Sequence, residues 1–307
     1  MKILHRSSLS IVISLGVAVI LFASSFIKSG FAQNLTSSQT LEVSPPSQEF
    51  KGDPGATVKV KAKVRNKSAS SVSITTRIED FTASGEGGQV ALTDSGPYAI
   101  SSWMTLDTPV FVLKPGETKE VTGTAKIPLG FAGGRYGSFV FSVGGASAGA
   151  GSAAVSQEVA SLFLLRISGP MTEQLLIDSF SAPSFLEFGP VPMDLAFTNK
   201  GNVHVKANGL INVRDVFGNT TADIVFRGEN VFPDATRKQS VYLDRKWLFG
   251  PYTAQAVLTY GSKNESITST TTFFVFPLRV VVAIVIVGLV LFVMRKRLRK
   301  AFKALVG

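Results

Sequence analysis

Hydrophobic and polar residues alternate over short segments in the middle of this chain, and this period of two constrains the fold more than any other feature. Ala56 to Val64 reads A-T-V-K-V-K-A-K-V, which places apolar side chains on one face and three lysines on the other. Val72 to Ile78 continues in the same way. Such alternation is typical of half-buried antiparallel strands. No long amphipathic segment competes with it, so the sequence predicts an all-β fold.

Glycine and proline separate the predicted strands at 52–55, 85–88, 115–116 and 130–134. Many short strands between turns favour two tandem immunoglobulin-like β-sandwiches, at residues 41–168 and 171–272. The predicted strands of the first are 56–64, 72–78, 110–113, 118–127, 138–143 and 160–167, and those of the second are 175–180, 193–199, 209–215, 241–244, 253–260 and 267–276.

Local repeats support a duplication. Asn66-Lys67-Ser68 matches Asn199-Lys200-Gly201, and each tripeptide closes a predicted strand. Gly134-Arg135-Tyr136 matches Gly250-Pro251-Tyr252 in the same way at the start of a strand. In immunoglobulin-like sandwiches such a tyrosine packs at a sheet corner and its hydroxyl binds backbone.

Residues 144–154 contain only glycine, alanine and serine. Such a segment could be a flexible linker between the two sandwiches. The pattern favours a long hairpin loop, because the predicted strands 138–143 and 160–167 would then be the last two of the first sandwich. The linker would in that case be the short segment 168–170.

The N-terminus has the features of a secretory signal. Basic residues precede an apolar stretch from Leu9 to Phe22, and Gly30-Phe31-Ala32 has small residues at the positions read by a signal peptidase. We expect residues 1–32 to be a signal peptide cleaved after Ala32. An uncleaved signal anchor is the alternative, and both interpretations place the middle of the chain outside the cell.

An apolar run from Phe273 to Met294 predicts one transmembrane helix, because a helix of about 20 apolar residues crosses a bilayer. Residues 295–307 form a basic tail, which the positive-inside rule places in the cytoplasm. The expected product is a single-pass membrane protein with its N-terminus outside. The predicted flank of the anchor consists of Arg279, Arg295, Lys296, Arg297, Arg299 and Lys300.

The net charge of +10 does not indicate a nucleic-acid partner. Ten of the 31 Lys and Arg residues lie in the signal, the anchor or its tail, so 21 remain against 21 Asp and Glu in residues 33–272. A nucleic-acid-binding surface would need an excess of basic residues in that part. The chain also contains no cysteine, so the exported part must rely on a hydrophobic core.

The sequence offers little catalytic chemistry. His204 is the only histidine after the signal, and we expect it at the surface beside a turn. One histidine without cysteine excludes the usual zinc sites, and no G-x-S-x-G motif accompanies it. Glu79 and Asp80 point to opposite faces of a strand, and we expect solvated charges there. Trp103 and Trp247 are expected to pack in the core or at corners. We therefore predict neither an enzyme nor a bound cofactor.

Residues 41–168 resemble the membrane-anchored WxL-interacting protein family of bacterial surfaces. The order of signal, two sandwiches, anchor and basic tail matches the same family over the whole chain. The matching segments are V-S-P-P at 43–46, the strand and N-K-S turn at 58–68, I-E-D-F-T at 78–82, S-W-M-T-L at 102–106, V-L-K-P-G-E-T-K-E-V at 112–121 and I-P-L-G-F-A-G-G-R-Y-G-S-F-V-F at 127–141.

The resemblance implies a bacterial cell-surface adhesion or scaffolding protein that binds peptidoglycan or another surface protein and catalyses no reaction. It assigns no residue to the partner, and the oligomeric state stays open. The alternative is a chaperone-like or assembly component that binds secreted partners by β-strand addition. That alternative predicts a long unpaired edge strand beside a hydrophobic groove.

Overall fold

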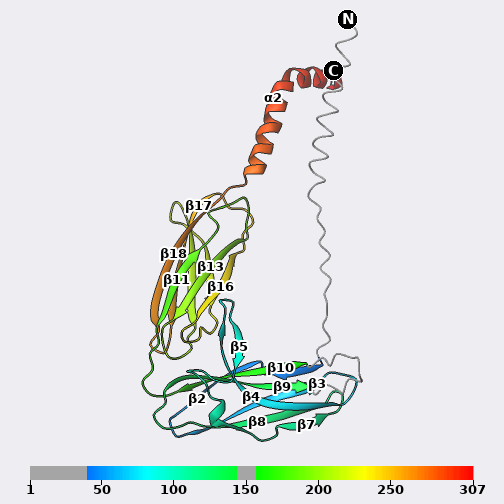
Figure 1. Ribbon diagram of the computed structural model, residues 1–307. Coiled ribbons are helices and arrows are strands. Elements are labelled where there is room, and N and C mark those ends of the chain that lie inside the picture. Colours follow the sequence, from blue (N-terminus) through cyan, green and yellow to red (C-terminus); the bar gives the residue numbers. More distant parts are fainter. Residues whose placement is uncertain (1–39, 144–156, 307) are drawn as a thin grey trace. The chain divides into compact units, whose positions relative to one another are not determined.

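The computed structural model describes residues 40–143 and 157–306. This part of the chain is mostly β, with one α-helix at its C-terminal end, as predicted (Figure 1). Its strands form four sheets, which fall into two pairs, and each pair encloses its own buried hydrophobic cluster. We call the pair from residues 41–167 the N-terminal sandwich and the pair from residues 175–275 the C-terminal sandwich.

The N-terminal sandwich joins a four-stranded and a six-stranded sheet. The first has the order β1 (Leu41–Ser44), β3 (Thr57–Asn66), β8 (Thr118–Lys126) and β6 (Met104–Leu106), and the 3-10 helix η1 (Ser101–Trp103) precedes β6. The second has the order β2 (Ser47–Gly52), β10 (Glu158–Ile167), β9 (Gly133–Val143), β4 (Val72–Ser84) and β5 (Gln89–Thr93), and β7 (Val110–Leu113) also pairs with β4.

The alternation in the sequence decides which side chains fill this core. Val60, Ala62 and Val64 of β3 are buried, and the residues between them are exposed. They pack with Phe139 and Phe163 from the opposite sheet, whose rings lie 5.1 Å apart. Burial of a large apolar side chain stabilises a fold by about 1.5–3 kcal/mol.

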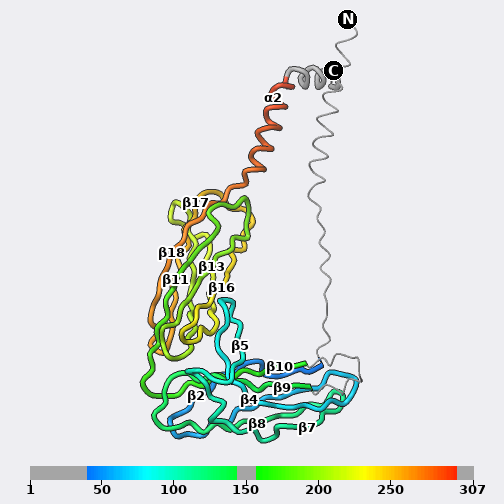
Figure 2. The backbone as a smooth tube through the Cα atoms, viewed as in Figure 1, coloured from blue at the N-terminus to red at the C-terminus, as the bar shows by residue number. Residues whose placement is uncertain are grey.

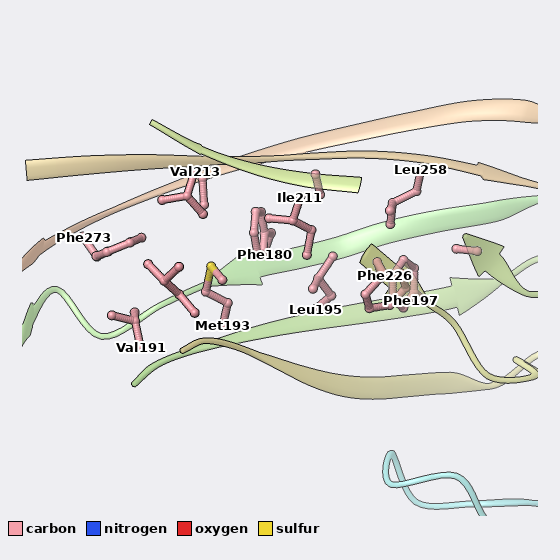
Figure 3. Close-up of a cluster of buried hydrophobic side chains, with 14 of the residues drawn as sticks. Phe180, Val191, Met193, Leu195, Phe197, Ile211, Val213, Phe226, Leu258 and Phe273 are labelled. Atoms are coloured by element: carbon pink, nitrogen blue, oxygen red, sulfur yellow. The ribbon is translucent and has the colours of Figure 1, made fainter. Parts of the chain in front are cut away.

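The C-terminal sandwich joins a three-stranded and a five-stranded sheet. The first has the order β11 (Leu175–Ser181), β13 (Val191–Asn199) and β16 (Thr236–Leu243). The second has the order β12 (Phe185–Leu186), β18 (Glu265–Val275), β17 (Gly250–Tyr260), β14 (Ala207–Asp215) and β15 (Thr220–Arg227). Figure 3 shows side chains of both sheets, such as Leu195 and Leu258, inside the core between them.

Strands β9 and β10 pair as antiparallel neighbours, from Ser142 opposite Glu158 onwards. The Gly, Ala and Ser segment 144–154 falls outside the described residues, but the strands on either side of it belong to one hairpin. The connection between the two sandwiches is instead the segment 168–174, between β10 and β11.

Helix α2 (Leu278–Val306) begins five residues later than the apolar run predicted. Phe273 to Val275 complete β18 because Phe273 is buried in the core and stacks on Tyr252 at 5.5 Å. Only Phe276 and Pro277 separate β18 from the helix, so the chain passes directly from one to the other (Figure 2). The helix also continues through the predicted tail to Val306.

Candidate functional site

Loops of the C-terminal sandwich contact the N-terminal sandwich, and we call this contact region the junction. Tyr136 of β9 and His204 lie at its centre, with 2% and 4% of their surfaces exposed. The backbone N–H of His204 donates to the Tyr136 hydroxyl at 2.8 Å, and the imidazole Nδ1 lies 3.3 Å from the same oxygen. Burial lowers the pKa of His204 to about 4, so the imidazole is neutral at neutral pH.

A second group at the junction surrounds Glu49 of β2. Its carboxylate accepts from Lys206 Nζ at 2.6 Å and from Asn230 Nδ2 at 2.8 Å, and it lies 3.9 Å from His204 Nε2. Burial alone raises the pKa of Glu49, but these hydrogen bonds and the Lys206 charge hold it below its usual value. Glu49 therefore stays ionised and ties β2 to two loops of the other sandwich.

The connecting segment is fixed by a third polar group. Arg166, near the end of β10, donates to Glu173 at 2.6 Å and to the carbonyl of His204 at 3.1 Å. The other carboxylate oxygen of Glu173 accepts from the Ser262 N–H at 2.7 Å and from its hydroxyl at 2.6 Å. Because Arg166 and Glu173 are both largely buried, this pair contributes more than a solvent-exposed ion pair would.

An aromatic cluster fills the space beside these polar groups. Phe81, Tyr136 and Phe232 form edge-on or tilted pairs with ring centroids 5.0–5.8 Å apart. Leu164 completes the buried cluster, and the Tyr98 hydroxyl beside it donates to Asp234 at 3.0 Å. The junction thus has an apolar centre with hydrogen bonds around it.

The β4–β5 hairpin extends to the C-terminal sandwich because β4 leaves β9 at Asp80. The buried Asp80 carboxylate accepts from the N–H groups of Ile100 and Ser101 and from the Ser101 hydroxyl, at 2.6–2.8 Å. At the tip of the hairpin, the carbonyl of Glu86 accepts from the N–H of Lys238 on β16 at 2.6 Å.

An open cleft of about 340 Å³ lies between this hairpin, β10 and a loop of the C-terminal sandwich. We call it the junction cleft. Its apolar wall consists of Val90, Leu162, Leu164 and Phe232, and its polar wall of Lys206, Glu229, Asn230 and Arg237, with Ser47, Gly88 and Gly228 between them.

Buried polar atoms beside the junction cleft lack hydrogen-bond partners among the described residues. They are Asn230 Oδ1, Arg237 Nε and Gln239 Nε2. Arg237 also forms an ion pair with Glu229, whose side chain is 65% exposed. Burial lowers the pKa of the Arg237 guanidinium. A buried polar atom without a partner costs about 1–3 kcal/mol, so these atoms favour a bound polar group in the cleft.

At the opposite end of the C-terminal sandwich lies the predicted anchor. Residues Leu278–Arg295 of α2 have a mean hydropathy of 2.6, and none of them is buried. Arg279 forms an ion pair with Glu187 at 3.2 Å, and Arg295 lies over the Phe292 ring at 4.2 Å. The other predicted flank residues, Lys296, Arg297, Arg299 and Lys300, lie on the same helix, and Ala32 falls outside the described residues.

Several expectations for single residues were wrong. His204 is buried rather than at the surface, because the Tyr136 hydroxyl and the Glu49 carboxylate face it. Asp80 is 1% exposed and binds backbone, although Glu79 does point the other way, toward Arg77. Trp247 is 53% exposed and belongs to no core.

The hydroxyls of the paired tyrosines bind backbone as predicted, although Tyr136 does so across the junction rather than at a corner of its own sandwich. The hydroxyl of Tyr136 accepts a backbone N–H from His204, and that of Tyr252 accepts one from Phe249 at 3.1 Å. The predicted turn at 85–88 is present, whereas Gly133 and Gly134 open β9. Among the described residues, no three His, Asp or Glu side chains gather where a metal ion could bind.

Known proteins similar to this chain were found only by structure. No protein-family model and no curated protein sequence matches it. Three similar solved structures are a chaperone–tip adhesin complex of CFA/I fimbriae, the class 5 fimbriae chaperone CfaA and the chaperone YadV. Their identities to this chain are 13%, 14% and 9%, with TM-scores of 0.40, 0.39 and 0.38.

The three matches each cover 76% of this chain and 99%, 98% and 100% of the other chains. At these low identities and TM-scores, the matches do not indicate a function for this chain.

Proposed function

We propose that this chain is a membrane-anchored binding protein of the cell surface, built from two tandem immunoglobulin-like domains, and that it holds a partner without catalysis. The observation that carries this proposal is helix α2. Its apolar segment is 18 residues long, about 27 Å at the usual rise of a helix, and none of it is buried against the described part of the chain. Such a surface needs an apolar solvent, which a bilayer supplies.

The basic residues after the helix support one orientation of the chain in the membrane. The basic residues that follow Arg295 would stay in the cytoplasm, which leaves both sandwiches outside the cell. The resemblance to the WxL-interacting family favours the same arrangement on a bacterial surface, with peptidoglycan or another surface protein as the partner.

The junction cleft is the binding site that we propose. Val90, Leu164 and Phe232 offer an apolar wall, and Arg237, whose Nε has no partner among the described residues, offers a hydrogen-bond donor beside it. An extended segment of a partner protein with an apolar side chain next to a carboxylate would satisfy both walls, including the unpartnered Arg237 Nε.

The absence of cysteine makes the topology easy to test. A single cysteine at Ser266, which is exposed on β18 at the end of the C-terminal sandwich away from α2, should react with a membrane-impermeant maleimide on intact cells. The matched control, a single cysteine at Ala304, should react only after the cells are lysed. Equal labelling of both sites on intact cells would contradict the anchor.

The cleft is tested by a photoreactive benzoylphenylalanine at Val90, with Val112, which is 63% exposed on β7, as the control position. We expect cross-linked products from Val90 only. Arg237→Gln should weaken capture by roughly tenfold to a hundredfold, because a hydrogen bond to a charged group is worth about 1.5–3 kcal/mol. Equal cross-linking from both positions, or capture unaffected by R237Q, would argue against the cleft.

A second candidate function is assembly by β-strand addition, and the edge of β16 favours it. Among the described strands β16 pairs only with β13. Because the N–H of Lys238 points outward to Glu86, the N–H groups of Ser240 and Tyr242 on the same edge also point outward. This edge belongs to a strand of eight residues and adjoins the junction cleft at Arg237.

A further inference from the structure

Exposed aromatic and aliphatic side chains gather at one end of the C-terminal sandwich. They lie in the turn after β14, in the loop between β16 and β17, and beside the last residues of β18. We call this group the rim. Its members and their exposed fractions are Phe185 (48%), Val216 (66%), Phe217 (85%), Trp247 (53%), Phe249 (60%) and Phe274 (40%).

Strand register places the rim at the end from which α2 leaves. Asp215 lies opposite Tyr252, and Gly250 lies opposite Val275, so the turn that begins at Val216 and the loop that ends at Phe249 are both beside the end of β18. Phe185 pairs with Phe274 on the neighbouring strands. The rim therefore surrounds the start of the helix.

The rim contributes little to the core of the sandwich. Its rings pack on one another and on the partly buried Phe188: Trp247 lies edge-on to Phe188 at 5.3 Å and stacks on Phe249 at 6.4 Å, and Phe185 stacks on Phe274 at 6.1 Å. At the opposite end of this sandwich, the described loops 200–206, 228–235 and 261–264 contain no exposed large hydrophobic residue. Leu210, Val225 and Val257 are exposed on the strands, but the exposed Phe and Trp side chains of this sandwich all belong to the rim. A cluster of exposed rings with little part in the core indicates a binding surface.

The helix decides what covers the rim. Phe276 and Pro277 are the only residues between β18 and α2, and two residues span at most about 7 Å. If α2 crosses a bilayer, the rim must lie at the surface of that bilayer. Trp and Phe side chains favour the interface between headgroups and acyl chains. Arg245 and Lys246 precede Trp247 in the loop between β16 and β17 and add positive charge beside the rim.

We infer that the rim inserts into the interfacial layer of the outer leaflet, so that the C-terminal sandwich is seated on the lipid and held at two places, by α2 and by the rim. This inference rests on the proposed anchoring by α2. The occupant is lipid rather than a second protein, because the rim lies at the end of the sandwich from which the apolar helix leaves after only two residues.

The two tryptophans permit a direct test with the full chain in vesicles whose acyl chains are brominated close to the glycerol. Trp103→Phe leaves Trp247 as the only tryptophan. We expect these lipids to quench its fluorescence at least about twofold, as for an interfacial side chain. Trp103, observed alone after Trp247→Phe, should not be quenched.

Variants separate the rim from other exposed apolar residues. The double substitution Phe217→Ser and Phe249→Ser should reduce the quenching of Trp247, because it removes two inserted rings. Leu129→Ser, which changes a residue 79% exposed in the N-terminal sandwich, should leave the quenching unchanged.

The experiment distinguishes failure of the anchoring proposal from failure of the rim inference. If the chain stays in the vesicles after an alkaline carbonate wash but Trp247 is not quenched, the rim inference is overturned and the anchor stands. If the wash removes the chain, the anchor itself is overturned. If Trp247 is shielded from water but unaffected by brominated lipid, a protein covers the rim, and the inference is wrong.

Discussion

At the scale of single residues, the sequence predicted the backbone contacts of the repeated tyrosines but not the burial of His204 at the junction. The two tyrosines were predictable because Gly134-Arg135-Tyr136 and Gly250-Pro251-Tyr252 repeat within the sequence. The burial of His204 was not predictable, because the Tyr136 hydroxyl that faces it comes from a strand 68 residues earlier. Its sequence neighbours, Asn202 to Lys206, indicate only that it lies beside a turn.

His204 should make the stability of the protein depend on pH. Its pKa falls from 6.5 in the unfolded chain to about 4 in the folded one, chiefly through burial. Between these values only the unfolded state binds the extra proton, so stability is complete above pH 6.5 and declines as the pH falls toward 4. The loss should reach about 1–3 kcal/mol.

This prediction can be checked by urea unfolding of the protein and of His204→Gln at pH 7 and pH 4.5. Glu49, Glu173 and the other carboxyl groups titrate in both proteins, so the difference between the two curves reports His204. The variant should lose less stability on acidification. Parallel curves would show that the histidine is not held neutral.

At the scale of elements, alternation located most of the strands but missed those with weak patterns. Strand β15 (T-T-A-D-I-V-F-R) was missed because only Phe226 is fully buried. β16 extends five residues before the predicted start at Val241, through the charged segment that begins at Thr236. The start of α2 could not be located from hydropathy, because Phe273 to Val275 are as apolar in a strand as in a helix.

The edge of β16 gives a prediction for strand addition. Ser240→Pro removes an outward N–H and keeps the ladder to β13, so the fold should survive. Gln239→Pro removes an inward N–H and should destabilise the protein by about 1–3 kcal/mol or more. Thermal unfolding measured by circular dichroism distinguishes the two.

Partner capture then decides between the candidate functions. If strand addition operates at this edge, S240P should lose capture, while Ser240→Ala, which removes only the hydroxyl bound to Asp194, should keep it. Full capture by a folded S240P protein would exclude addition at β16 and leave the junction cleft as the binding site.

At the scale of the whole molecule, the described residues from 40 to 306 belong to one compact unit although the sequence pattern predicts two sandwiches. The difference arises from contacts between residues far apart in the chain, such as Glu49 with Lys206 and Tyr98 with Asp234. Such pairs have no periodicity in the sequence. The resemblance to the WxL-interacting family stays a prediction, as does the signal peptide.

We predict that the two sandwiches unfold together. Trp103 lies in one and Trp247 in the other, so the variants W247F and W103F each report a single sandwich. In detergent solution, the two fluorescence transitions on heating should coincide, as expected for a cooperative unit. Two midpoints separated by more than the experimental error would show that the junction does not couple the sandwiches.

The direct passage from β18 into α2 also determines how this protein would respond to force. A pull on a captured partner would be resisted by the bilayer through α2, so tension would run along β18. Its eleven residue pairs with β17 would then be loaded in shear, parallel to the strands, and their hydrogen bonds would have to break together rather than one after another. Strand β18 would therefore resist the pull along its whole length instead of separating from β17 one residue pair at a time.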